Sequence, residues 1–89
     1  MSELNAEQLV LDNGYEDVVI LKDYSYDTAL IGITTDNRAV YDYDLMIEWL
    51  VKHESMSIEE AAEWIDYNTL GALPYAGGDG PLVMFRLIE

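Results

Sequence analysis

At 89 residues the chain has the length of one small domain, and its content of 51% hydrophobic residues excludes a disordered protein. It has no cysteine, which excludes disulfides and thiolate metal sites, and 18 acidic against 4 basic residues give a net charge of −14 at pH 7. Such a field repels nucleic acid and anionic membranes and attracts basic surfaces, although acidity can also serve solubility alone. No stretch resembles a secretory signal or a membrane span, so we expect a cytoplasmic single domain over residues 1–89.

The N-terminal part predicts a short helix and then a strand. Asn5 and Gln8 have the spacing of a capping box, and Asn13-Gly14 supplies a stop. The segment between them is either a helix or an irregular arm with an apolar side made by Leu4, Leu9, Val10 and Leu11. Residues 18–21 are a continuous apolar run, which is typical of a strand covered on both faces.

A β-hairpin is predicted next, from strands over residues 28–35 and 38–41. Asp36 and Asn37 lie between them, and both residue types tolerate the positive φ of a two-residue type I′ turn. Gly32 inside the first of these strands indicates a bulge or a close packing contact.

Two amphipathic helices follow the hairpin. The first is predicted to start near Asp42 or Asp44 and to end near His53, with apolar positions at helical spacing on one side: Tyr43, Met46, Ile47, Leu50 and Val51. The second starts at the capping box formed by Ser57 and Glu60. Its core positions should be Ile58, Ala61, Ala62 and Ile65, and Leu70-Gly71 followed by Pro74 should end it.

A glycine-rich loop over residues 75–81 leads to a final apolar strand over residues 82–88, which we expect inside the sheet because a bare edge is unfavourable for it. The predicted order is β-β-β-α-α-β, with a possible short N-terminal helix. This order indicates an α+β domain, with a mainly antiparallel four-stranded sheet and two helices on one face.

The chain shows no established catalytic, cofactor or metal signature, and we expect none of these sites. The lone His53 is explained by its place at the negative end of a helix. Asp42 and Asp44, joined by Asp79, could bind a hard cation, but capping a helix explains the first two better. The glycine-rich loop at residues 77–80 lacks the Lys-Ser/Thr of a phosphate-binding loop.

Several tyrosines alternate with acidic residues, namely Tyr24, Tyr26, Tyr41, Tyr43 and Tyr67. One interpretation is that these rings cover the ends of the sheet and helices with their hydroxyls in water. The other is that rings surrounded by carboxylates bind a basic partner, since arginine can stack on a ring and pair with an acid.

Three motifs carry a resemblance to known proteins: Ala39-Val-Tyr-Asp-Tyr-Asp44, Glu63-Trp-Ile-Asp-Tyr-Asn68 and Ala72-Leu-Pro-Tyr75. Through them, residues 28–88 resemble a group of small acidic proteins of Gram-positive gut bacteria and their phages and prophages. This resemblance implies no activity and no functional residues. In general character the chain is also similar to phage-encoded inhibitors of host defence, including anti-CRISPR and anti-restriction proteins, many of which act as DNA mimics.

We expect the acidic side of the two helices to bind a basic host protein that itself binds nucleic acid. The predicted partner-binding residues are Asp42, Asp44, Glu48, Glu59, Glu60, Glu63, Asp66 and Tyr67. Carboxylates on a helix repeat roughly every 5–6 Å, a spacing comparable to that of phosphates along a strand. We expect no direct binding of nucleic acid or membrane, and a monomer or small homo-oligomer.

Two alternatives remain open. The chain could be a small adaptor or oligomerising module whose acidity only provides solubility, with Trp49 and Trp64 forming an apolar interface patch. An enzyme is the weakest alternative, since it requires His53 in a pocket beside a carboxylate or hydroxyl.

Overall fold

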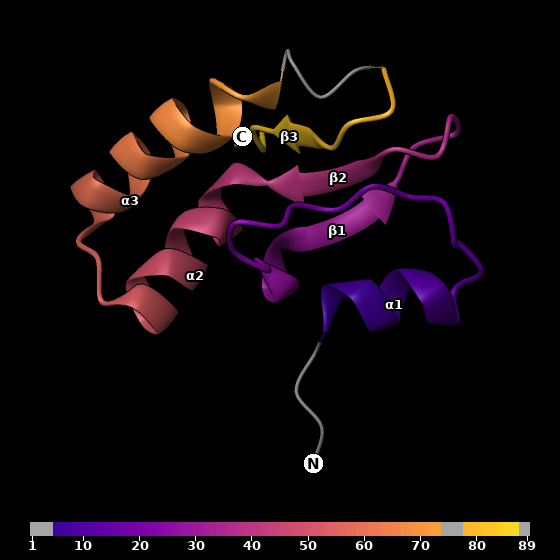
Figure 1. Ribbon diagram of the computed structural model, residues 1–89. Helices are drawn as coiled ribbons and strands as arrows, with labels where there is room; N and C mark the ends of the chain where they lie inside the picture. The colour runs from indigo at the N-terminus through magenta and orange to yellow at the C-terminus, as the bar shows by residue number, and fades with distance from the viewer. Residues whose placement is uncertain (1–4, 74–77, 88–89) are drawn as a thin grey trace.

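The computed structural model describes residues 5–73 and 78–87 (Figure 1). Its elements are α1 (Ala6–Asp12), the 3-10 turn η1 (Asp27–Ala29), β1 (Leu30–Ile33), β2 (Ala39–Asp42), α2 (Tyr43–Glu54), α3 (Ile58–Trp64), the π-helix η2 (Ile65–Leu70) and β3 (Leu82–Met84). The predicted α+β class is therefore confirmed. Among the predicted features, Leu4, Pro74, residues 75–77 of the loop and Ile88 lie outside the described residues.

The sheet within these residues has three strands in the order β1-β2-β3, with β1 antiparallel and β3 parallel to β2. The predictions of four mainly antiparallel strands and of an interior position for the last strand are wrong. Polar contacts at both ends of the β2–β3 pair hold the parallel register. Arg38 Nε donates to the Gly80 carbonyl at 2.9 Å where the strands begin, and Arg86 Nε donates to Asp42 Oδ2 at 3.0 Å where they end.

The β1–β2 hairpin confirms the predicted strand pair, and its register shift between Leu30 and Gly32 confirms the predicted bulge. Its turn differs from the prediction. The Thr34 N–H donates to the Arg38 carbonyl, so residues 35–37 form the loop, and in this loop only Asn37 has a positive φ, of 63°. A three-residue loop closed by a left-handed residue replaces the type I′ turn because the Thr34 hydroxyl bonds both the Asp36 carboxylate and the Arg38 N–H.

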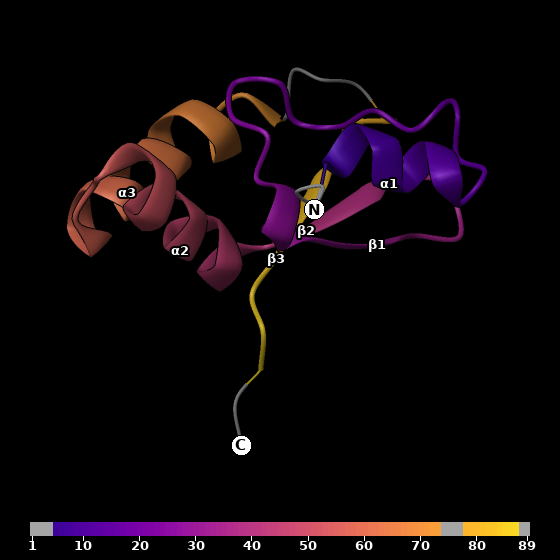
Figure 2. The same ribbon diagram turned by 90° about the horizontal axis from the view of Figure 1, so that it is seen from below.

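Residues 18–21 form no strand, contrary to the prediction. They belong to an irregular segment between α1 and η1 that crosses the sheet on the same side as α1 (Figures 1 and 2). Val18, Ile20 and Leu21 pack against the core, and the Leu21 N–H donates to the Tyr41 hydroxyl at 3.1 Å. Residues 18–21 are apolar because they cover the sheet. The Tyr41 side chain accepts the Leu21 N–H hydrogen bond that a backbone carbonyl would accept in a strand.

The predicted short N-terminal helix is confirmed as α1. The Asn5 side chain accepts a hydrogen bond from the Gln8 N–H, and Gly14 follows the helix with a φ of 88°. The Gln8 side chain donates to Asp12, so the cap is a simple N-cap. Val10 is buried on this helix, and Leu11 is exposed.

The two helices after the hairpin start where the sequence predicts. Asp42 caps α2, and Met46 and Leu50 are fully buried on it. The Ser57–Glu60 capping box at α3 is complete, with bonds of 3.1 and 3.2 Å. Ala61 and Ile65 are fully buried, as predicted, whereas Ile58 is 68% exposed, so its predicted core position is wrong.

The two helices lie side by side beyond the end of β2, and not over one face of the sheet as predicted (Figures 1 and 2). The reason is local, since α2 begins at Tyr43, directly after β2 ends at Asp42. No linking residue allows the helix to fold back over the sheet. Across residues 5–73 and 78–87, no helix combines the length and apolar character needed to cross a bilayer.

Candidate functional site

An open hollow of about 710 Å³ lies on the surface of α3 and η2, and we call it the acidic hollow. Its lining consists of apolar Met56, Trp64 and Tyr67 and of carboxylate-bearing Glu60, Glu63 and Asp66. Most of these positions recur at intervals of three and four residues along one helix face. The hollow therefore surrounds aromatic rings with negative charge on a rigid helical element.

The π-helix η2 presents the far end of the acidic hollow. The Gly71 N–H donates to the Asp66 carbonyl at 3.2 Å, five residues back, and the Asn68 side chain donates to the Trp64 carbonyl at 3.1 Å. Tyr67, on this wide turn, is 85% exposed. A large ring left so open is a common anchor for a protein partner.

Gly71 is expected to be required for this turn, because a Cβ there would lie only 2.5 Å from the backbone oxygen of Tyr67. Gly71→Ala should lower the free energy of unfolding by about 1–3 kcal/mol through overpacking. Gly78→Ala is the matched control, since a Cβ at Gly78 meets no atom within 4 Å. Urea unfolding of both variants measures the difference, and equal stabilities would show that η2 has room to adjust.

A tyrosine joins the acidic hollow to the first turn of α2. The Tyr43 hydroxyl donates to Asp66 Oδ1 at 3.1 Å, and the Tyr43 ring lies 4.8 Å from that of Phe85. Burial raises the pKa of Tyr43, and the carboxylates of Asp66 and Asp44 raise it further. Tyr43 is therefore a neutral donor at pH 7, which orients Asp66 at the edge of the hollow.

The acidic hollow brings together half of the predicted partner-binding residues, namely Glu60, Glu63, Asp66 and Tyr67. Asp44 and Glu48 are exposed on α2, and Glu59 is exposed on α3, but none of them lines the hollow. The charge of Asp44 still raises the pKa of Tyr43, whose hydroxyl donates a hydrogen bond to Asp66. Tyr43 therefore lies between Asp44, on α2, and Asp66, on η2.

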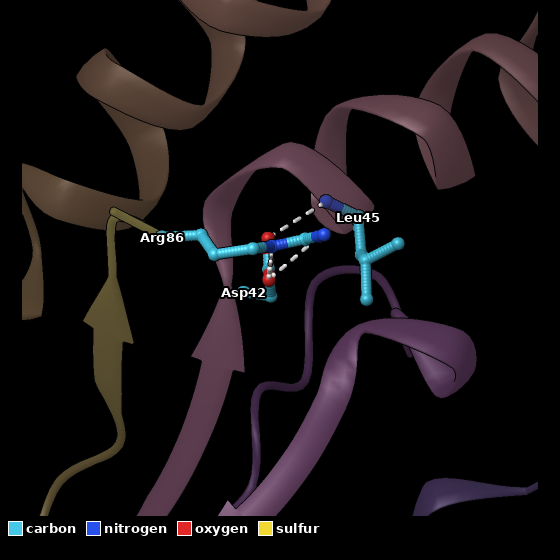
Figure 3. Close-up of polar contacts among 3 residues, drawn as sticks. All are labelled: Asp42, Leu45 and Arg86. Carbon is cyan, nitrogen blue, oxygen red and sulfur yellow. Dashed lines mark hydrogen bonds and ion pairs between the residues drawn. The ribbon is translucent and has the colours of Figure 1, made fainter. Parts of the chain in front are cut away.

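Asp42 is not part of that exposed set, because it is only 2% exposed. Figure 3 shows its carboxylate between the Leu45 N–H, at 3.2 Å from Oδ1, and the Arg86 guanidinium, with Nε and Nη2 each 3.0 Å from Oδ2. The carboxylate is a helix cap and one half of a partly buried ion pair. It has no oxygen turned toward a partner.

The three aspartates considered for a hard cation do not meet. Asp79 precedes β3 and Asp42 ends β2, and since these strands are parallel the two residues lie at opposite ends of the sheet. The described part of the chain contains no cluster of three or more His, Cys, Asp or Glu side chains that could hold a metal ion.

The tryptophans pack inward through a shared tyrosine. The Tyr24 ring lies 4.7 Å from Trp64 and 5.7 Å from Trp49, and the exposed His53 stacks on Trp49 at 4.6 Å. Trp49, Trp64 and Tyr24 are half-buried, so the predicted Trp49–Trp64 pair belongs to a partly buried aromatic cluster, and Trp64 also lines the acidic hollow. Of the tyrosines considered as surface rings, Tyr26 and Tyr41 are fully buried.

Met56 and Trp64 line the hollow but were not among the predicted partner-binding residues, and Trp64 was predicted only for the apolar patch of the adaptor alternative. Trp64 lies four residues after Glu60 on α3, which is a readable signal, whereas Met56 precedes the Ser57 cap, so helical periodicity does not place it. Phe85 carried no such signal, because its contact with Tyr43 depends on the parallel pairing of β3.

Alkaline pH is expected to destabilise the protein through its buried tyrosines. Burial raises the pKa of Tyr26 from 10.0 to about 12, partly offset by the Thr69 hydroxyl, and burial also raises the pKa of Tyr41. Above about pH 10 the unfolded chain releases phenolic protons that the folded protein keeps, so the free energy of unfolding falls as the pH rises toward 12. Urea unfolding between pH 8 and pH 11 measures this fall, and Tyr26→Phe should reduce its slope.

No protein-family model matches the chain, and no curated protein sequence and no solved structure matches it either. The resemblances described above therefore stay predictions. What the acidic hollow can bind follows from its own chemistry.

Proposed function

We propose that the protein is an acidic, protein-binding inhibitor of phage or mobile-element origin, which acts as a DNA mimic on a basic, nucleic-acid-binding host defence protein. The observation that supports this is the acidic hollow, where three carboxylates surround an 85% exposed tyrosine. The proposed action is binding in the cytoplasm, with no catalytic step.

Arginine is the side chain that such a hollow suits best. A guanidinium can stack on the Tyr67 or Trp64 ring and donate two parallel hydrogen bonds to the Glu63 or Asp66 carboxylate. Lysine offers one point charge and no flat surface for stacking. A groove lined with arginines, of the kind that holds nucleic acid, would match both features.

Further carboxylates are exposed outside the hollow. Glu59, Asp44 and Glu48 are exposed on the neighbouring turns of the two helices. Rows of carboxylates at helical spacing can replace phosphates along a basic groove. The net charge of −14 adds long-range attraction that speeds the encounter.

The experiment is capture of host proteins on the tagged chain, with identification of what is bound. A basic nucleic-acid-binding protein that is held at about 50 mM salt, released at about 500 mM and displaced by DNA supports the proposal. Capture that ignores salt and DNA, or the absence of a basic protein among those captured, contradicts it.

A second candidate is the adaptor or oligomerising module, and apolar side chains exposed on β1 and in the segment after β3 favour it. Leu87 is 96% exposed, Phe85 64% and Ile31 48%. Self-association of copies that each carry a charge of −14 should strengthen when salt is added, since screening weakens their repulsion. Light scattering at low and high salt separates the candidates, because binding to a basic partner weakens under the same change.

A further inference from the structure

A groove of about 310 Å³ lies between α1 and β1. All four residues of β1 line it, together with Leu9 and Val10 of α1 and with Asn13 and Tyr15 of the segment that follows. Within the described residues β1 is the only strand in its lining, and α1 lies beyond β1 on the side away from β2 (Figures 1 and 2). The groove therefore lies along the free edge of the sheet.

The backbone of β1 faces this groove with groups that can pair with another strand. The Thr34 N–H points toward β2, because it donates to the Arg38 carbonyl at 2.9 Å. Backbone groups alternate in direction along a strand, so the N–H and C=O of Ile33 point toward the free edge. Natural edge strands often carry a charged residue or a proline that prevents pairing, whereas β1 has the sequence Leu-Ile-Gly-Ile.

The walls of the groove are mostly apolar and partly open to solvent. Ile31 is 48% exposed and Tyr15 is 37% exposed, and Leu9 is half-buried on the opposite wall. Successive side chains of a strand point to opposite faces of a sheet. A strand added to β1 would therefore turn every second side chain toward α1, where apolar side chains would be buried.

The charge around the groove favours a basic occupant. None of the four Lys and Arg residues, all of which the structure describes, lines the groove. The exposed Asp12 immediately precedes the lining residue Asn13. The net charge of −14 repels a second copy of the chain and attracts a segment that carries Lys or Arg.

We propose that the groove binds an extended segment of a partner protein, which adds to β1 as a further strand. The segment has apolar side chains at alternate positions and a lysine or arginine beside them. Its backbone hydrogen bonds to β1 supply affinity, and the contacts of its alternate side chains with α1 supply specificity. This binding does not depend on the proposed DNA mimicry, since the groove and the acidic hollow share no lining residue among those described.

The probe is a synthetic seven-residue peptide, in which three valines alternate with two threonines between terminal lysines. NMR follows the amide signals of the isotope-labelled protein during titration to about 1 mM peptide. Saturable shifts are expected at residues 30–33 and at Leu9, Asn13 and Tyr15. The absence of saturable shifts overturns the proposal, and so do shifts confined to residues 60–67, which would show that the lysines bind the acidic hollow instead.

Two N-methylated forms of the peptide test whether it pairs as a strand. One form carries methyl groups on the valine amides and the other on the threonine amides. Because alternate amides of a strand point to opposite sides, only one form should bind about tenfold or more weakly than the parent peptide. Equal affinities of the two methylated forms overturn the proposal, and this comparison needs no variant of the protein.

Ile31→Lys is expected to weaken binding of the peptide by about tenfold or more, since a lysine at the edge opposes both strand pairing and a basic peptide. Val51→Lys makes the same charge change on α2, outside the groove, where the side chain is 38% exposed, and should leave the affinity nearly unchanged. Circular dichroism checks that both variants are folded. Equal effects of the two variants overturn the proposal. A dimer that Ile31→Lys dissociates, seen by light scattering without binding of the peptide, also overturns it, because a second copy would then fill the groove.

Discussion

Glu63→Lys combined with Tyr67→Ala is expected to weaken binding of the basic partner by about 100-fold or more. The first change turns a charge attraction into repulsion, and the second removes the ring on which an arginine can stack. Both side chains are exposed, and neither donates or accepts a hydrogen bond within the described residues. The loss should therefore appear in the affinity and leave the fold intact, as titration calorimetry and circular dichroism would measure.

Glu16→Lys is the matched control for the charge. It changes the net charge of −14 by the same amount as Glu63→Lys, at an exposed position away from the acidic hollow. If the control weakens binding as much as Glu63→Lys alone, only the overall field matters and the hollow is not the contact surface. If it has a small effect that disappears at high salt, the local contacts at the hollow account for the difference.

Arg86→Met is expected to lower the free energy of unfolding by about 2–3 kcal/mol, because it leaves the Asp42 carboxylate buried with a single N–H partner. This is below the usual cost of breaking a buried pair, since the Arg86 side chain is itself 52% exposed. Lys52→Met, at an exposed position near the end of α2, removes one positive charge as a control and should change stability by less than about 0.5 kcal/mol. Urea unfolding of the unaltered protein, Arg86→Met and Lys52→Met measures the three free energies of unfolding.

A double variant tests whether the unpaired charge causes that loss. Asp42→Ser keeps an oxygen able to cap α2 but removes the charge, so adding it to Arg86→Met should recover part of the lost stability. A double variant less stable than Arg86→Met would show that Asp42 stabilises mainly through the cap, and the ion pair would then matter little.

The elements that could be predicted are those whose signals lie within a few residues. Ser57 and Glu60 form their capping box from side chains three positions apart, and the start of α2 at Asp42 depends on one such contact. The hairpin follows from the apolar runs that flank Asp36-Asn37, two residue types that favour a turn. Even there the loop has three residues instead of the predicted two, because the Thr34 hydroxyl hydrogen-bonds both the Asp36 carboxylate and the Arg38 N–H.

The candidate site divides in the same way. Glu60, Glu63, Asp66 and Tyr67 were predictable because helical periodicity puts them near one another on the continuous helical stretch of α3 and η2. The burial of Asp42 in an ion pair was not predictable, because its partner Arg86 is 44 residues away and reaches it only through β3. The same long-range pairing brings Phe85 to Tyr43.

By itself the sequence determined the helices, the hairpin and the charge of the helical surface, because caps, periodicity and composition act locally. The tertiary structure decided which strand pairs with β2, that residues 18–21 cover the sheet without joining it, and which carboxylates remain exposed. Apolar runs such as residues 18–21 and 82–84 contain no local signal that distinguishes a strand of the sheet from an irregular segment packed on it. Only the contacts that close over long chain distances, from Arg38 to Gly80 and from Arg86 to Asp42, make that choice.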